Sequence, residues 1–101
     1  MNLVNDYLVN VSSAVCLVCG VESEKIRLAT GQQFAETEYC YGDILINDID
    51  IWNNIKKDTH YKEYLENRLC ETLLNGFSSA MVEITAGYDT GCVNIGWGVE
   101  P

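Results

Sequence analysis

The chain has 101 residues, 48% of them hydrophobic and only one of them proline, which predicts a folded globule and excludes an intrinsically disordered protein. Fifteen carboxylates against six lysines and arginines give a formal net charge of −9 at pH 7. A field of this sign repels nucleic acid and anionic membranes, so we expect no direct binding to either, and it favours basic surfaces. The alternative to a basic partner is that the negative charge only keeps a small protein soluble.

The negative charge is concentrated in two tracts. Residues 28–55 contain five acids and no base, and four acids with no base follow Arg68. The five cysteines would suggest disulfides in a secreted protein, but we find no export signal and no apolar run of the ~20 residues that span a bilayer. We therefore expect a reduced, cytoplasmic protein.

The N-terminal third predicts a helix followed by two strands. Apolar residues at helical spacing over residues 3–18 indicate a core helix, with Asn2 as a candidate N-cap and Gly20 as its stop, although residues 14–19 also fit a buried strand. Alternation over residues 25–30 predicts a strand closed by Gly31, and residues 35–41 predict a half-exposed strand. Gly42 and Asp43 should end that second strand.

The middle of the chain leaves one alternative open. Residues 44–55 fit a strand with a kink near residues 47–48, and residues 47–55 fit a short helix equally well. The next segment predicts an amphipathic helix, because Tyr61, Leu65, Leu69 and Leu73 recur at four-residue spacing. Asp58 or Thr59 is its candidate cap. Gly76 should end it in a left-handed conformation.

The last twenty residues predict a hairpin. Val82, Ile84 and Ala86 alternate with more polar residues, residues 87–91 form a turn-rich break, and the next apolar residues again recur with period two. The second strand has bulky side chains on one face and Gly96 and Gly98 on the other, so a helix or a partner could approach that bare face closely. The fold class is α+β: a single small domain, two helices against a mainly antiparallel sheet, in the order α-β-β-(β or α)-α-β-β.

For several residues that could bind a metal or take part in catalysis, a structural role is the better interpretation. Cys16 and Cys19 have the spacing of half a zinc site or a redox pair, but the other cysteines are scattered singly, so core packing is favoured. His60 is the only histidine and stands on a solvated helix face with no nucleophile placed beside it. Acid pairs such as Glu36 with Glu38 lack the ligand ladder of a calcium loop. We expect no metal, no cofactor and no enzymatic activity.

The tripeptide Asp89-Thr90-Gly91 resembles the catalytic triplet of aspartic proteases. In that family the triplet lies near the start of the subunit, and the chain after it builds the flap and the strands around the catalytic loop. Ten residues follow Gly91 here, and a hairpin turn accounts for the same three residue types. We therefore reject the protease interpretation.

One constellation of acids and large aromatics favours a binding surface. Carboxylates steer a basic partner, while tyrosine and tryptophan supply anchoring area. The alternative is that the aromatics face the core and the acids are merely solvated. The candidate partner-binding residues are Glu36, Glu38, Tyr39, Tyr41, Asp43, Asp48, Asp50 and Trp52, with Glu83, Tyr88 and Asp89 as a second patch at the hairpin.

Two functional hypotheses follow. The first is a small acidic, non-enzymatic inhibitor that occludes a basic protein, such as a nuclease or another nucleic-acid-handling protein, with carboxylates standing where phosphates would sit. In size, charge and lack of catalytic motif the chain is similar in type to phage-encoded, anti-CRISPR-like inhibitors of host defence nucleases and to immunity proteins that block toxin nucleases. The alternative is a structural or assembly subunit, of a phage particle or of a homo-oligomer such as a homodimer, that associates through its C-terminal strand.

Overall fold

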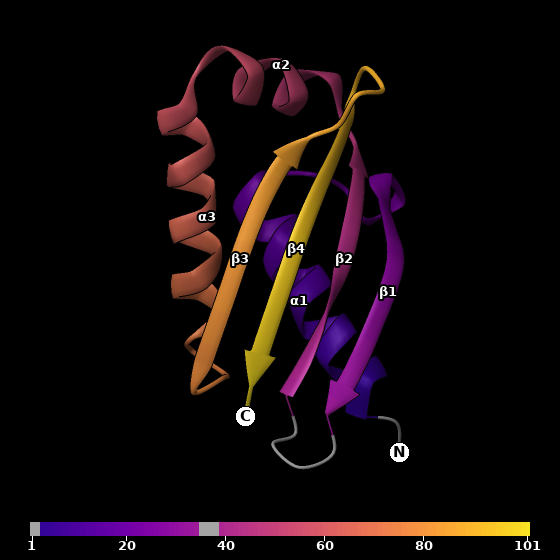
Figure 1. The fold of residues 1–101 in the computed structure, drawn as a ribbon, viewed down its shortest axis with the longest axis vertical. Coiled ribbons are helices and arrows are strands. Elements are labelled where there is room, and N and C mark those ends of the chain that lie inside the picture. Colours follow the sequence, from indigo (N-terminus) through magenta and orange to yellow (C-terminus); the bar gives the residue numbers. More distant parts are fainter. Residues whose placement is uncertain (1–2, 35–38) are drawn as a thin grey trace.

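The computed structural model describes the backbone of residues 3–34 and 39–101 and the side chains of residues 6–27 and 39–101. It confirms an α+β fold with an antiparallel sheet (Figure 1). Within the described residues, no helix is both long and apolar enough to cross a membrane. The elements in chain order are α1 (Leu3–Cys19), the 3-10 turn η1 (Ser23–Lys25), β1 (Ile26–Phe34), β2 (Tyr39–Asn47), α2 (Ile49–Lys57), α3 (Thr59–Leu73), β3 (Ser79–Ala86) and β4 (Cys92–Glu100).

The four strands form one antiparallel sheet in the order β1-β2-β4-β3. The C-terminal strand β4 is therefore central, and its backbone pairs with β2 on one side and with β3 on the other. Because side chains alternate along a strand, β4 directs Val93, Ile95, Trp97 and Val99 to one face, where all four are buried. The predicted hairpin and its bulky face are confirmed.

The helices leave one face of the sheet uncovered. In Figure 1, α1 lies behind the sheet, α3 runs beside β3, and α2 crosses one end, while no helix crosses the front. Apolar side chains of α1 and α3, such as Val15 and Leu69, pack with Ile44 and Ile95 of the sheet into one core. Full burial of an aliphatic side chain of this size contributes about 1.5–3 kcal/mol. Glu66 of α3 also accepts a hydrogen bond from the amide of Ile84 at 2.8 Å, so it satisfies one backbone donor on the edge strand.

Several predicted boundaries are wrong, and pairing explains the errors in the strands. Strand β1 continues through Gly31, and β2 continues through Gly42 and Asp43, because Gly31 pairs with Gly42 and Asp43 pairs with Gly96 across the sheet. Part of the predicted strand over residues 35–41, and the candidate cap Asn2, lie outside the described residues.

The helix predictions fare better. The open choice at residues 44–55 is decided for the helix, because α2 spans Ile49–Lys57, and only residues 44–47 belong to a strand, the end of β2. The predicted cap at Asp58 is confirmed, because its side chain accepts a hydrogen bond from the His60 amide at 2.9 Å. Gly20 ends α1 with a φ of 67°, as expected. Gly76 does not adopt the left-handed conformation that we predicted for it.

Asp48 fixes the start of α2. Its side chain accepts a hydrogen bond from the Ile51 amide at 3.0 Å and pairs with Lys25 at 3.2 Å, and its own amide donates to the carbonyl of Gly91. The hydrogen bond from Ile51 is the largest reason that the pKa of Asp48 lies below its ordinary value, and Lys25 adds to it against the opposing effect of burial. This carboxylate is therefore part of the scaffold.

We predict that Asp48→Ala lowers the free energy of unfolding by about 1 kcal/mol at pH 7, the usual cost of a lost N-cap. The folded pKa is depressed, so this contribution is present above the ordinary pKa and is lost as the pH falls through the folded pKa. In urea denaturation, the difference in the free energy of unfolding between wild type and variant should accordingly become smaller below about pH 4. Glu63→Gln, an exposed change on α3, is the control, and a gap that stays constant to pH 2 contradicts this account.

Candidate functional site

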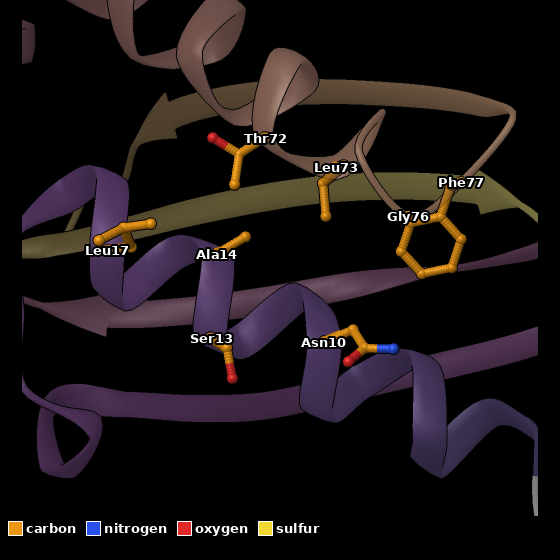
Figure 2. Close-up of a pocket in the computed structure, with 8 residues that line it drawn as sticks. All are labelled: Asn10, Ser13, Ala14, Leu17, Thr72, Leu73, Gly76 and Phe77. Carbon is orange, nitrogen blue, oxygen red and sulfur yellow. The ribbon is translucent and has the colours of Figure 1, made fainter.

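Two hollows on the described surface differ in character. The first lies between α1 and the C-terminal end of α3, encloses about 340 Å³, and is drawn in Figure 2. Leu17 stands at this hollow and is 76% exposed. Its described lining contains no ionisable group, so it offers no electrostatic selection of a ligand; the lining residues are Asn10, Ser13, Ala14, Leu17, Thr72, Leu73, Gly76 and Phe77.

The second hollow lies on the uncovered face of the sheet and encloses about 510 Å³. It combines aromatic and aliphatic surface with two carboxylates, and none of its described lining residues is basic. We call it the sheet-face hollow and take it as the candidate site. Its lining residues are Tyr39, Tyr41, Gly42, Asp43, Met81, Glu83, Gly96 and Trp97.

Strand β4 has glycine at two positions on this face, and the first of them, Gly96, lines the hollow. In the strand register, Gly98 stands between Tyr41 of β2 and Met81 of β3. Gly96 stands between Asp43 and Glu83 in the same way. Residues opposite one another in an antiparallel pair share a face, so each glycine stands between two larger side chains. The ring of Tyr39 fills the space above Gly98, whereas a Cβ at Gly96 would meet no atom closer than 3.6 Å.

Two tyrosines close one end of the hollow. The ring of Tyr39 lies over Gly98, so closely that a Cβ on Gly98 would collide with its hydroxyl and with Cζ at 2.8 Å. The rings of Tyr39 and Tyr41 are 5.9 Å apart between centroids and tilted by 36°. Met81, 65% exposed, stands across Gly98 from Tyr41. This part of the face combines aromatic rings with a flexible methionine side chain.

Two carboxylates flank the hollow at the level of Gly96. Asp43 accepts a hydrogen bond from the side-chain amide of Asn94 at 3.3 Å, and Glu83 is exposed. One strand separates them, so their backbones are about 10 Å apart at the usual spacing between strands. Neither makes an ion pair within the described part of the chain, and Arg27, the described base on this face of β1, stands opposite Leu45. The negative charge at the hollow is therefore not neutralised by a described lysine or arginine.

The structure divides the eleven predicted binding residues into groups. Tyr39, Tyr41, Asp43 and Glu83 meet at the sheet-face hollow. Five others gather at the end of the molecule where α2 crosses the sheet and the β3–β4 turn lies, namely Asp48, Asp50, Trp52, Tyr88 and Asp89 (Figure 1). Glu36 and Glu38 lie outside the described residues.

Members of the group near α2 differ in what they do. Asp48 is committed to the cap, and the indole N–H of Trp52 donates to the carbonyl of Gly87 at 2.9 Å, which ties α2 to the sheet. Asp50 and Tyr88 are exposed. The carbonyl of Asp89 accepts from the Cys92 amide within the turn. Asp48 and Trp52 therefore stabilise this end of the fold, a structural role that the sequence did not indicate.

The sequence did not identify Met81 and Asn94 as residues of the site. It identified the bare glycine face of the last strand, but not the residues that flank this face on the neighbouring strands. A period-two pattern places Met81 and Glu83 on one face of their strand. It does not say that β4 lies between that strand and Asp43, since the two are forty positions apart in sequence. The strand order was the missing information.

The cysteines show no sign of nucleophilic or metal chemistry in the described structure. Burial, with a smaller contribution from Cys16 and Asp48, raises the pKa of Cys19 to about 11, so its thiol stays protonated at neutral pH. No group of three or more potential ligands forms a metal site among the described residues. His60 is exposed at the start of α3. Absence of an enzymatic activity stays a prediction.

Comparison with known proteins gives no further guidance: the chain matches no family model, no curated protein and no solved structure. Its function has to be argued from its own geometry.

The two glycines of the site provide a matched pair of substitutions. Gly98→Ala should push the Tyr39 ring aside, whereas a Cβ at Gly96 comes no closer than 3.6 Å to any neighbour. We predict that Gly98→Ala is less stable than Gly96→Ala by about 1 kcal/mol, the cost of an unfavourable rotamer. Urea denaturation measures the difference, and NMR of the Tyr39 ring protons should show displacement in Gly98→Ala alone. Equal stability together with unchanged ring shifts would show that Tyr39 does not cover Gly98.

Proposed function

We propose that the protein is a small, non-enzymatic inhibitor that binds a basic, nucleic-acid-handling protein and covers its site with the uncovered face of the sheet. The observation that carries the proposal is the sheet-face hollow, where Tyr39, Tyr41 and Met81 adjoin two carboxylates with no described basic residue in the lining. The aromatic and aliphatic groups supply anchoring area, and the carboxylates supply electrostatic selection.

The net charge of −9 supports the same proposal on a larger scale. It would accelerate encounter with a positively charged surface and repel nucleic acid that competes for that surface. Inhibition would be steric and electrostatic, with Asp43 and Glu83 taking positions that phosphates otherwise occupy. Host defence nucleases and nuclease toxins are the classes of partner that fit this chemistry.

The alternative of an assembly subunit that pairs through its C-terminal strand has less support. Strand β4 already pairs on both sides, so a second chain would have to displace β2 or β3 before it could bond to β4. The outer edges of β1 and β3 remain for such pairing. Strand β1 has a register irregularity between Leu28 and Thr30, and a bulge of this kind disfavours edge-to-edge association. Helix α3 runs beside β3, and its Glu66 already accepts a hydrogen bond from the amide of Ile84.

A pull-down with charge-matched variants tests the inhibitor proposal. Asp43→Asn/Glu83→Gln removes two charges from the hollow, and Glu63→Gln/Glu71→Gln removes two exposed charges from α3. Each protein is immobilised and exposed to the lysate of its own cell at about 0.1 M and about 0.5 M salt. We expect wild type and the α3 variant to retain a basic nucleic-acid-binding protein at low salt, and the hollow variant to lose it.

The captured protein is then purified and its nucleic-acid binding followed by fluorescence anisotropy. Saturating wild type should abolish that binding, whereas the hollow variant should leave it intact. Equal capture by both variants would contradict the choice of surface. A captured protein that still binds nucleic acid in the presence of saturating wild type would contradict inhibition.

A further inference from the structure

We propose that the sheet-face hollow is a receptor for one arginine side chain of the partner, an inference that rests on the proposed function and specifies its recognition chemistry. The hollow offers two carboxylates on opposite sides of a bare glycine, with an aromatic pair and a methionine next to them. An occupant must therefore carry a positive charge and a long apolar stem.

The separation of the carboxylates favours a guanidinium. Asp43 and Glu83 are each one strand away from Gly96, so about 10 Å separates their backbones, and both side chains extend above the sheet. A guanidinium presents five N–H donors in a planar fork and can bond to carboxylates on two sides at once. A lysine ammonium is a compact point charge that is more strongly hydrated.

The rest of the hollow suits the arginine stem. Tyr41 and Met81 flank Gly98, the next glycine along β4 on the same face, and Tyr39 lies over it. The methylene groups can pack on this apolar surface while the planar head stacks against a tyrosine ring. A bare metal ion fits worse, because hard cations such as Ca²⁺ take six or more oxygen ligands and no third ligand joins the two carboxylates among the described residues.

Asp43 is already oriented for such a contact. The amide of Asn94 donates to its Oδ1, and Gly96 lies beside that same oxygen, with a hypothetical Cβ at 3.6 Å. The hydrogen bond restricts the side chain and leaves acceptor positions on the carboxylate for a second donor. The partner's arginine would therefore meet a carboxylate whose direction is set before binding.

The test uses blocked amino acids as probes and ¹⁵N NMR of the protein as the readout. N-acetyl-arginine-N-methylamide, the lysine analogue and the uncharged citrulline analogue are titrated in turn to millimolar concentrations. We expect arginine to shift the amides of Gly96, Gly98 and Glu83, lysine to bind about threefold more weakly, and citrulline to bind least. Asp43→Asn/Glu83→Gln should weaken arginine binding by about tenfold, while Glu63→Gln/Glu71→Gln should leave it unchanged.

Shifts of equal size at exposed acids elsewhere, or arginine binding that survives Asp43→Asn/Glu83→Gln in a variant with a native-like spectrum, would overturn the arginine receptor. Binding of lysine as tight as that of arginine would overturn the guanidinium assignment. These failures are distinct from failure of the proposed function. The pull-down and the nucleic-acid competition judge inhibition whichever side chain the hollow receives.

Discussion

The structure depends on the difference between the two faces of β4. This strand lies in the middle of the sheet and presents four buried apolar side chains to the helices, while its opposite face has glycine at positions 96 and 98. The bulky face holds the core together, because α1 and α3 pack against the same side of the sheet. The opposite face borders the hollow, where β2 and β3 supply the tyrosines, the methionine and the two carboxylates, and β4 contributes Gly96 and the mostly buried Trp97.

Local patterns predicted the elements of this fold more successfully than their connections. Periodicity gave α1, α3 and the C-terminal hairpin, and the cap at Asp58 followed from residue type. The glycines at 31 and 42 read as strand ends in the sequence, yet pairing with a neighbour carries both strands through them. Tertiary hydrogen bonds decided that outcome, and the sequence of a single strand contains no information about them.

The candidate site was predictable only in part for the same reason. Acids and aromatics in residues 36–52 suggested one continuous surface. In the structure, Asp48 caps α2 and Trp52 of α2 bonds to the carbonyl of Gly87, so both have structural roles. Strand β2 places Tyr39, Tyr41 and Asp43 on the uncovered face. The contribution of β3 to that face depends on strand order. A surface built from two strands on either side of a third cannot be read from the spacing of residues along the chain.

Hydroxyl-radical footprinting of the protein bound to its captured partner would test the central claim most directly. Met81 is 65% exposed on the sheet face, and Tyr64 is 57% exposed on α3, so each reports the solvent access of one side of the molecule. We predict that the partner protects Met81 from oxidation and leaves Tyr64 as reactive as in the free protein. Protection of Tyr64 with undiminished oxidation of Met81 would contradict it.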